Sequence, residues 1–326
     1  MFVKGFAEFG KQVMKEEPFK KRVLFLGIPD MAYICLDGLV MSGVNIVGVL
    51  GAKKDHPTYL SFKNFAKSRD LNFIEYDRLD DKNFIDEIKV LKADIAVVCS
   101  FNYKIPKVLL EAVKGGFINV HPSLLPKYRG ANPYSAAIIN NEKETGVTLH
   151  FMDENFDTGD IISQKKIQIS SMETMGTLFN RLNMLALGML VETLKEYEKS
   201  DLPRKKQPDG KFEEGKLFDG DLFFINYEKT AEEIERFIRS LNPFLIATTG
   251  FRKNPVKIFA AQSAKGKSEA LPGTIVKIGD DKFYIATKDG LLCPTVLQFG
   301  SFFTGTASDF IKILNPKIGE KFEWLD

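Results

Sequence analysis

GFINVHPSLLPKYRGANPYSAAIINNEKETGVTLHFMDENFDTGD, residues 116–160, combines two strand-like runs with the polar residues that follow them. Its first six residues form a short apolar run that ends before Pro122, which predicts a buried strand. Asn119 and His121 are two residues apart, so on a strand their side chains point to the same side. They would lie at the carboxyl end of the strand, where open α/β sheets bind ligands.

A carboxylate is expected beside this pair. Residues 146–152 form the second strand-like run, and Asp157 follows it in the turn NFDTGD. These residue types suit acyl transfer: His121 can exchange a proton near neutral pH, Asn119 can donate to a developing oxyanion, and Asp157 can orient the imidazole. Taken alone, the residues leave open the alternative that this histidine is a hydrogen-bonded polar residue of the core.

Strand-like and helix-like segments alternate in the first half of the chain. Short runs rich in Val, Ile and Leu predict strands at residues 21–27, 44–50, 71–76 and 93–100. Helices are predicted at residues 29–43, 58–69, 81–91 and 132–140. This alternation indicates a doubly wound, Rossmann-like α/β fold with a mostly parallel sheet. Gly27 is a single glycine and not part of a Gly-x-Gly-x-x-Gly motif, so no NAD site is expected.

The sequence changes character near residue 200. Residues 201–220 are rich in Lys, Pro, Gly and Glu and lack an apolar period, which predicts a linker. After it, an amphipathic helix and several short strand-like runs separated by turns predict a small open β-barrel. The helix is expected at residues 230–241 and the strands at 256–261, 273–278, 283–287 and 291–298. We therefore expect an N-terminal extension (1–18), a catalytic domain (19–200), the linker and a C-terminal β-barrel domain (221–326).

Composition narrows the class of protein. The 326 residues suffice for two domains, and 44% hydrophobic and 27% charged residues are typical of a globular protein. A net charge of +2 is too small to indicate nucleic-acid binding by itself. The three cysteines and three histidines are scattered without metal-ligand spacing, so we expect a reducing cytoplasm, no disulfide framework and no metal. We also expect no signal peptide, no membrane-spanning run and no membrane partner, and a homo-oligomer is left open.

Three ordered motifs carry a resemblance to a known family. They are Asn119-Val-His-Pro-Ser-Leu-Leu-Pro-Lys-Tyr-Arg-Gly130, Glu144-Thr-Gly-Val-Thr-Leu-His150 and Asp157-Thr-Gly-Asp160. Together they resemble the 10-formyltetrahydrofolate-dependent formyltransferases, which act on methionyl-tRNA, glycinamide ribonucleotide or sugar nucleotides. The resemblance implies that Asn119, His121 and Asp157 are catalytic, that 10-formyltetrahydrofolate is the donor, and that no metal is needed. Residues 238–244, IRSLNPF, resemble the start of the C-terminal domain of the tRNA enzyme, so the resemblance covers nearly all of the chain after residue 20.

The same resemblance implies two loops that hold the pterin of the folate, mostly through backbone groups. The implied folate-binding residues are Phe101, Tyr103, Lys104, Ile105, Asp153 and Glu154. The alternative for the two aromatic residues is that they are core side chains. Arg129 is a candidate for binding a phosphate or carboxylate of the acceptor, and the alternative is a solvated surface arginine.

The acceptor is expected to be a primary amine, and two features favour an amino-sugar nucleotide. The tRNA enzymes of the family have a long basic loop after the second strand, whereas here that loop is only residues 51–57. Residues 221–326 contain 14 Lys and Arg against 13 Asp and Glu, a net charge of +1, although tRNA binding draws on phosphate neutralisation. The alternative acceptor is initiator methionyl-tRNA. A second alternative is a non-catalytic folate-binding or nucleotide-binding protein, which would not need all three catalytic residues.

Overall fold

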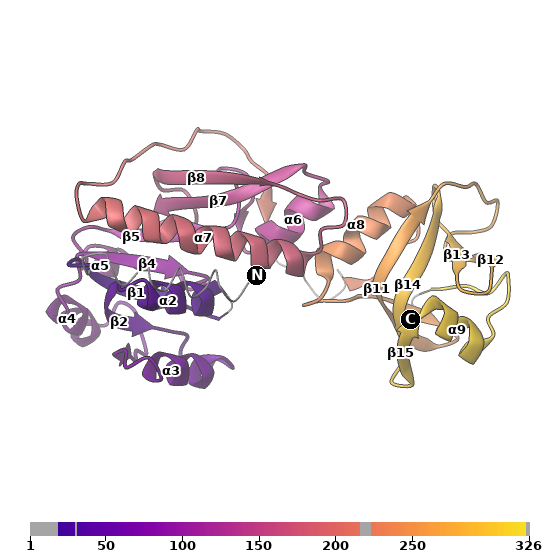
Figure 1. Cartoon of the computed structure of the whole chain (residues 1–326), viewed down its shortest axis with the longest axis horizontal. Helices are drawn as coiled ribbons and strands as arrows, with labels where there is room; N and C mark the ends of the chain where they lie inside the picture. The colour runs from indigo at the N-terminus through magenta and orange to yellow at the C-terminus, as the bar shows by residue number, and fades with distance from the viewer. Residues whose placement is uncertain (1–18, 30, 216–222, 324–326) are drawn as a thin grey trace, which may run out of the picture. The chain divides into compact units, whose positions relative to one another are not determined.

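The computed structural model describes residues 19–29, 31–215 and 223–323, which fold into two compact units (Figure 1). The first unit contains the described residues up to Ala131, together with Thr145–Ile167 and Arg181–Glu214. The second contains Asn132–Glu144, Gln168–Asn180 and the described residues from Gly215 onward. The predicted N-terminal extension and residues 216–220 of the predicted linker lie outside the described residues. The predicted division into an N-terminal extension, a catalytic domain, a linker and a C-terminal domain stays a prediction.

A seven-stranded sheet forms the centre of the first unit, in the order β3-β2-β1-β4-β5-β7-β8. The first five strands pair in parallel, and β5 and β7 pair antiparallel. The order turns back at β1, which has β2 on one side and β4 on the other, as doubly wound sheets do. The predicted mostly parallel α/β fold is confirmed. The bounds are β1 (Arg22–Gly27), β2 (Asn45–Leu50), β3 (Phe73–Ile74), β4 (Ile95–Cys99), β5 (Phe117–His121), β7 (Glu144–Phe151) and β8 (Ile161–Gln168).

Helices connect these strands. Each of the four helices predicted in the first half is present and somewhat shorter than its predicted range. The strand β8 and the helix α5 were not predicted, because IISQKKIQ is apolar mainly at its ends and KVLL is too short to show a helical period. The bounds are α2 (Met31–Met41), α3 (Tyr59–Lys67), α4 (Lys82–Val90), α5 (Lys107–Leu110), α6 (Pro133–Ile139) and α7 (Met175–Tyr197). The two-residue strands are β6 (Arg129–Gly130) and β9 (Glu214–Gly215).

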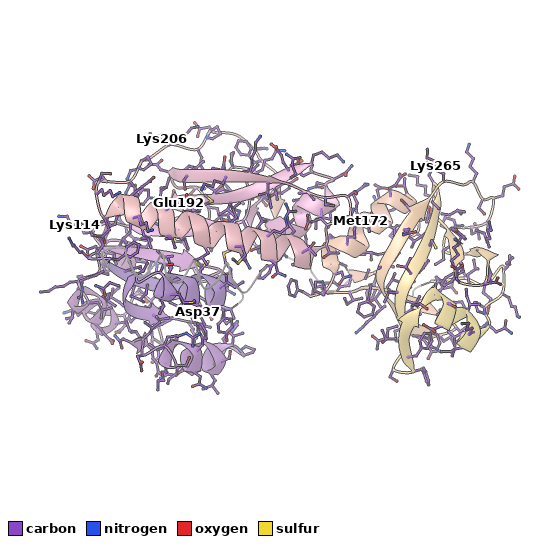
Figure 2. All side chains as sticks on the ribbon, viewed as in Figure 1. Asp37, Lys114, Met172, Glu192, Lys206 and Lys265 are labelled. Atoms are coloured by element: carbon purple, nitrogen blue, oxygen red, sulfur yellow. The ribbon has the colours of Figure 1, made fainter. Side chains whose placement is uncertain are left out.

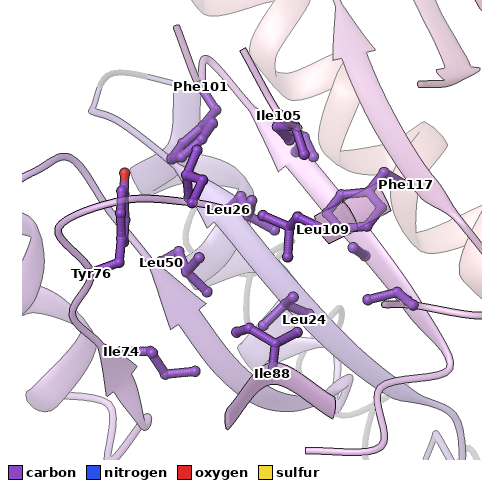
Figure 3. Close-up of a cluster of buried hydrophobic side chains, with 14 of the residues drawn as sticks. Leu24, Leu26, Leu50, Ile74, Tyr76, Ile88, Phe101, Ile105, Leu109 and Phe117 are labelled. Carbon is purple, nitrogen blue, oxygen red and sulfur yellow. The ribbon is translucent and has the colours of Figure 1, made fainter. Parts of the chain in front are cut away.

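Burial of the strands holds the first unit together. All five residues of β4 are buried, as expected for a central parallel strand that is covered on both faces. Charged side chains such as Lys114, Glu192 and Lys206 are exposed (Figure 2). One cluster of buried side chains joins the sheet to the residues that follow β3 and β4 (Figure 3). It includes Leu24, Leu26, Leu50, Ile74, Tyr76, Ile88, Phe101, Ile105, Leu109 and Phe117.

An antiparallel sheet forms the second unit, in the order β10-β11-β14-β13-β12, and β15 pairs with β14. The predicted small C-terminal β domain is confirmed, and its predicted helix is α8 (Ala231–Leu241). The strands β10 and β15 and the helix α9 were not predicted, although Thr306 and Asp309 form a capping box at the start of α9. The remaining bounds are β10 (Ala247–Phe251), β11 (Asn254–Ala264), β12 (Ile275–Ile278), β13 (Phe283–Ala286), β14 (Leu291–Phe299), β15 (Phe303–Thr306) and α9 (Ala307–Leu314).

Aromatic rings fill the core of the second unit. The ring centres of Phe251 and Phe322 are 4.7 Å apart, and those of Phe283 and Phe310 are 5.1 Å apart. None of these four side chains is more than 1% exposed. Stacked aromatic pairs contribute beyond the area that they bury. The second unit therefore has a hydrophobic core of its own.

Candidate active site

The strand β5 ends with the two polar residues of the predicted motif. Asn119 is half-buried and His121 is 4% exposed. In the antiparallel pairing with β7, Asn119 lies opposite His150 and His121 lies opposite Thr148. This register brings a second histidine to the site from a strand that lies 31 residues further along the chain.

Asp157 enters the site from the loop between β7 and β8. Its φ of 56° is in the left-handed region, which aspartate tolerates better than most residues. The loop is closed by a hydrogen bond from the backbone N–H of Phe151 to the carbonyl oxygen of Asp160 (2.9 Å). It also packs tightly at Gly159, where a Cβ atom would lie 1.9 Å from the carbonyl oxygen of Phe151. The carboxylate is therefore held by a tightly packed turn.

The structure brings the three predicted catalytic side chains together. The amide Nδ2 of Asn119 donates to Asp157 Oδ1 at 3.1 Å, and His121 Nδ1 lies 3.5 Å from Asp157 Oδ2. The backbone N–H of Gly130 also donates to Oδ2, at 2.9 Å. Burial by itself raises the pKa of Asp157, but the neighbouring His121, His150 and Gly130 N–H outweigh it and hold the pKa well below its usual 3.8. Asp157 is therefore an anion at neutral pH.

The contacts of His121 identify its protonated nitrogen. A carbonyl oxygen can only accept, so the 2.8 Å contact between Nε2 and the carbonyl oxygen of Tyr128 puts the proton of the neutral ring on Nε2. Nδ1 then carries the lone pair that faces Asp157. Burial lowers the pKa of His121 below its usual 6.5, and the charge of Asp157 opposes this shift without cancelling it. His121 is therefore neutral at pH 7, with its proton-accepting atom beside a carboxylate.

His150 is the residue of this cluster that the sequence reasoning missed. Its Nδ1 donates to the carbonyl oxygen of Phe151 at 2.8 Å, so its Nε2 accepts from Asn119 Nδ2 at 3.1 Å. Because a second hydrogen of that amide donates to Asp157, both Nδ2 hydrogens of Asn119 are used. A donor bond from Asn119 to an oxyanion therefore requires the release of one of these partners. The sequence does place His150 on a predicted strand. Its position opposite Asn119, however, depends on the register between the two strands, which the sequence motif does not reveal.

The residues implied for folate binding lie in two loops, one before α5 and one between β7 and β8. Phe101 (8% exposed) and Ile105 (3% exposed) belong to the core cluster of Figure 3, and Tyr103 packs on Phe101 with ring centres 5.3 Å apart. Lys104 is exposed. Glu154 pairs with Lys107 at the start of α5, with Oε1 and Nζ 3.5 Å apart.

Asp153 organises the second of these loops. Its carboxylate accepts from the backbone N–H of Asn155 at 2.9 Å and from the hydroxyl of Thr158 at 2.7 Å. An ion pair thus links the second implied folate loop to the helix that follows the first. The ring of Phe101 is buried, in agreement with the alternative that it is a core side chain. At Phe101 only the backbone groups could contact a ligand.

Arg129 points to a glutamine rather than to open solvent. Its Nη2 and Nε donate to Gln207 Oε1 at 2.6 and 3.3 Å, and its guanidinium carbon lies 5.8 Å from the ring centre of Phe212. Arginine has five N–H donors, so the bonds to Gln207 use two of them. The acceptor-binding role of Arg129 stays a prediction.

No group of three or more His, Cys, Asp or Glu side chains in the described ranges could hold a metal ion. Among the helices that the structure describes, none is long and apolar enough to cross a membrane.

Comparison with known proteins identifies the family. Residues 37–194 match the formyl transferase family, and residues 220–315 match the formyl transferase C-terminal domain. The chain belongs to the formyltransferase family. Members of this family use a formyltetrahydrofolate donor, so the predicted formyl transfer and its donor class are supported.

Relatives and solved structures extend this likeness. The methionyl-tRNA formyltransferase of Clostridioides difficile is 33% identical over 89% of this chain and 96% of its own length. That of Azobacteroides pseudotrichonymphae is 35% identical over 90% of this chain and 96% of its own. The N-formyltransferase of Helicobacter canadensis, solved with folinic acid and dTDP-3-aminofucose, has the same fold (TM-score 0.62, 22% identity, 84% of this chain and 98% of that one). So does HypX of Aquifex aeolicus (TM-score 0.63, 16% identity, 94% of this chain and 52% of that one).

Proposed function

We propose that this protein transfers the formyl group of 10-formyltetrahydrofolate to the amino group of methionyl-tRNA. The observation that carries the proposal is that relatives named methionyl-tRNA formyltransferase align over about nine tenths of this chain at 33–35% identity. The sugar N-formyltransferases are similar at 22% identity, which supports the fold alone. The comparisons therefore favour the alternative acceptor of the sequence analysis over the amino-sugar nucleotide.

The donor is assigned to the two implied folate loops. The backbone of residues 101–105 follows the carboxyl end of β4, where a ligand of this sheet is expected, and residues 153–154 open the loop that carries Asp157. Tyr103 and Lys104 have side chains that are not fully buried and can contact the ligand directly. Phe101 and Ile105 would act through their backbone groups, since their side chains lie in the core.

The chemistry begins with attack of the acceptor amine on the formyl carbon, which turns the formyl oxygen into an oxyanion. Asn119 donates an amide hydrogen to that oxygen after releasing its bond to Asp157. His121 takes a proton from the attacking nitrogen at Nδ1, and the new N–H donates to Asp157. The carboxylate thus exchanges one donor for another.

The bond between the formyl carbon and the folate nitrogen then breaks. The proton held between His121 and Asp157 passes to the departing folate nitrogen, so one proton moves overall from the acceptor amine to the folate. Loss of one oxyanion donor typically lowers turnover by about 10²- to 10³-fold. Asn119 is therefore expected to matter for kcat more than for substrate binding.

An amino-sugar nucleotide is a second candidate acceptor, because the loop after β2 is short and its lysines are engaged. Lys54 Nζ lies 3.1 Å from Glu75 Oε2, and Lys53 Nζ lies 5.8 Å from the ring centre of Tyr103. Lys54 is thus paired with a carboxylate of the same unit, and Lys53 lies near an aromatic ring of that unit. These contacts favour a compact acceptor over an extended phosphate backbone.

The deciding experiment measures kcat/KM for both acceptors with 10-formyltetrahydrofolate at about 0.15 M salt, where phosphate contacts are screened as in cells. Initiator methionyl-tRNA and a dTDP-amino sugar are compared, with uncharged tRNA as the negative control. We expect saturable formylation of methionyl-tRNA with the higher kcat/KM. Transfer to the sugar nucleotide alone would refute the proposed acceptor and leave formyl transfer standing.

A further inference from the structure

Gln207 turns inward from an exposed segment. It lies in the segment that follows α7, beside the labelled Lys206 (Figure 2). In residues 203–210, all of which the structure describes, every residue except Gln207 is exposed. A single half-buried amide in such a segment indicates that its side chain has partners inside the unit.

The amide of Gln207 holds the loop that carries Asp157. Its Nε2 donates to the backbone carbonyl oxygen of Asp157 at 2.8 Å and to that of Gly159 at 2.9 Å. These bonds use both amide hydrogens, so the orientation of the side chain is determined. The two bonded residues are Asp157, whose φ is 56°, and Gly159, which packs tightly against the Phe151 carbonyl.

The other end of the same amide holds the loop that follows β5. Gln207 Oε1 accepts from Arg129 Nη2 and Nε. Arg129 lies between Tyr128, whose carbonyl oxygen accepts from His121 Nε2, and Gly130, whose N–H donates to Asp157 Oδ2. Two backbone groups hold the His121–Asp157 pair, the Tyr128 carbonyl and the Gly130 N–H. They belong to the two residues on either side of Arg129, which Gln207 binds.

We propose that Gln207 is a positioning residue for formyl transfer, which clamps these two loops so that the Asp157 carboxylate stays beside His121 Nδ1. The inference rests on the proposed function, since it assigns the pair a role in the reaction. Misplacement of a catalytic group by about 1 Å can lower the rate by about 10²-fold. Hydrogen-bond partners that orient metal ligands typically contribute about 10- to 100-fold to activity, and we expect a similar magnitude for Gln207.

The test compares three variants. Gln207→Met keeps the length of the side chain and removes all its hydrogen bonds, whereas Gln207→Glu keeps the acceptor for Arg129 and loses both donors. Gln164→Met is the control: Gln164 is an exposed glutamine whose Nε2 also makes two donor bonds, to Leu125 O (3.0 Å) in the loop that follows β5 and to Thr148 Oγ1 (2.8 Å) on β7, but none to the Asp157 loop, so it cannot hold the two loops together.

We expect both Gln207 variants to lose about 10- to 100-fold in kcat with a smaller change in the KM of the acceptor. Gln164→Met should stay within a few-fold of the parent protein. Equal losses in all three variants, or no loss in either Gln207 variant, would overturn the proposal.

A second readout does not depend on turnover. The chain has three histidines, so an NMR titration can follow His121 with His121→Gln as the assignment control. The charged and titratable groups that act on His121 are Asp157, His150 and Arg129. Because Asp157 raises the pKa of His121, its displacement in Gln207→Met should lower that pKa further.

An unchanged His121 titration in folded Gln207→Met would overturn the clamp. If the parent protein formylates no acceptor, the proposed function fails, while this titration still tests whether Gln207 positions the pair. The two failures are therefore distinguishable.

Discussion

Replacing Asp157 with asparagine tests the proposed mechanism most directly. The substitution keeps the size of the side chain and removes its charge. In the parent protein one carboxylate oxygen accepts from Asn119 Nδ2 and the other from the Gly130 N–H. An amide has only one oxygen, so one of these two donors loses its acceptor. The Asp157→Asn variant should fold, because the turn itself is held by backbone bonds and by Gln207.

The magnitude follows from the separation of the two groups. An imidazolium and a carboxylate 3.5 Å apart, as His121 Nδ1 and Asp157 Oδ2 are, attract by about 5 kcal/mol at an effective dielectric constant of about 20. Since about 1.4 kcal/mol corresponds to a tenfold change in rate, loss of this attraction should lower kcat by about 10³- to 10⁴-fold. The loss should appear in kcat because His121 becomes charged during the reaction and not before it.

The assay measures single-turnover formyl transfer at saturating 10-formyltetrahydrofolate, together with thermal unfolding of both proteins. Asp37→Asn is the control, because Asp37 (Figure 2) forms an exposed ion pair with Arg69 at 2.7 Å in the same unit. It should leave kcat unchanged. If folded Asp157→Asn kept kcat within tenfold of the parent protein, Asp157 would be a turn residue and the mechanism would be wrong.

Three further predictions concern pH and stability. The pKa of His121 is lower in the folded protein than in the unfolded chain, so the unfolded chain binds more protons between that pKa and 6.5. The free energy of unfolding, measured with urea at pH 7, 6 and 5, should therefore fall as the pH falls. The fall should be smaller in His121→Gln. Phe310→Ala should cost about 3–5 kcal/mol in the unfolding of the second unit, against less than about 0.5 kcal/mol for Phe302→Ala, whose ring is 75% exposed; equal costs would contradict the assigned core. Gly159→Ala should cost about 1–3 kcal/mol in thermal unfolding and reduce kcat, since its Cβ meets the Phe151 carbonyl; an unperturbed variant would show that the loop yields freely.

Sequence patterns were sufficient for the fold class and for three polar residues of the site, Asn119, His121 and Asp157. The alternation of buried strands and amphipathic helices predicted the parallel sheet, because each strand must bury two faces and each helix one. Asn119 and His121 were recognisable from strand alternation, since residues two apart share a face. Both patterns depend only on residues that are close together in the chain, so they can be read directly from the sequence.

Contacts between distant segments were decided only by the tertiary structure. His150 reaches Asn119 through an antiparallel register, and a shift of one residue would have turned its side chain to the other face. Gln207 reaches the Asp157 loop from 50 residues further along the chain, in a segment with no apolar period. The protonated nitrogen of His121 likewise depends on the Tyr128 carbonyl, because a backbone group gives no sign of its partner in the sequence. The sequence by itself therefore determined which residue types the site contains, and the fold determined which of their atoms face one another.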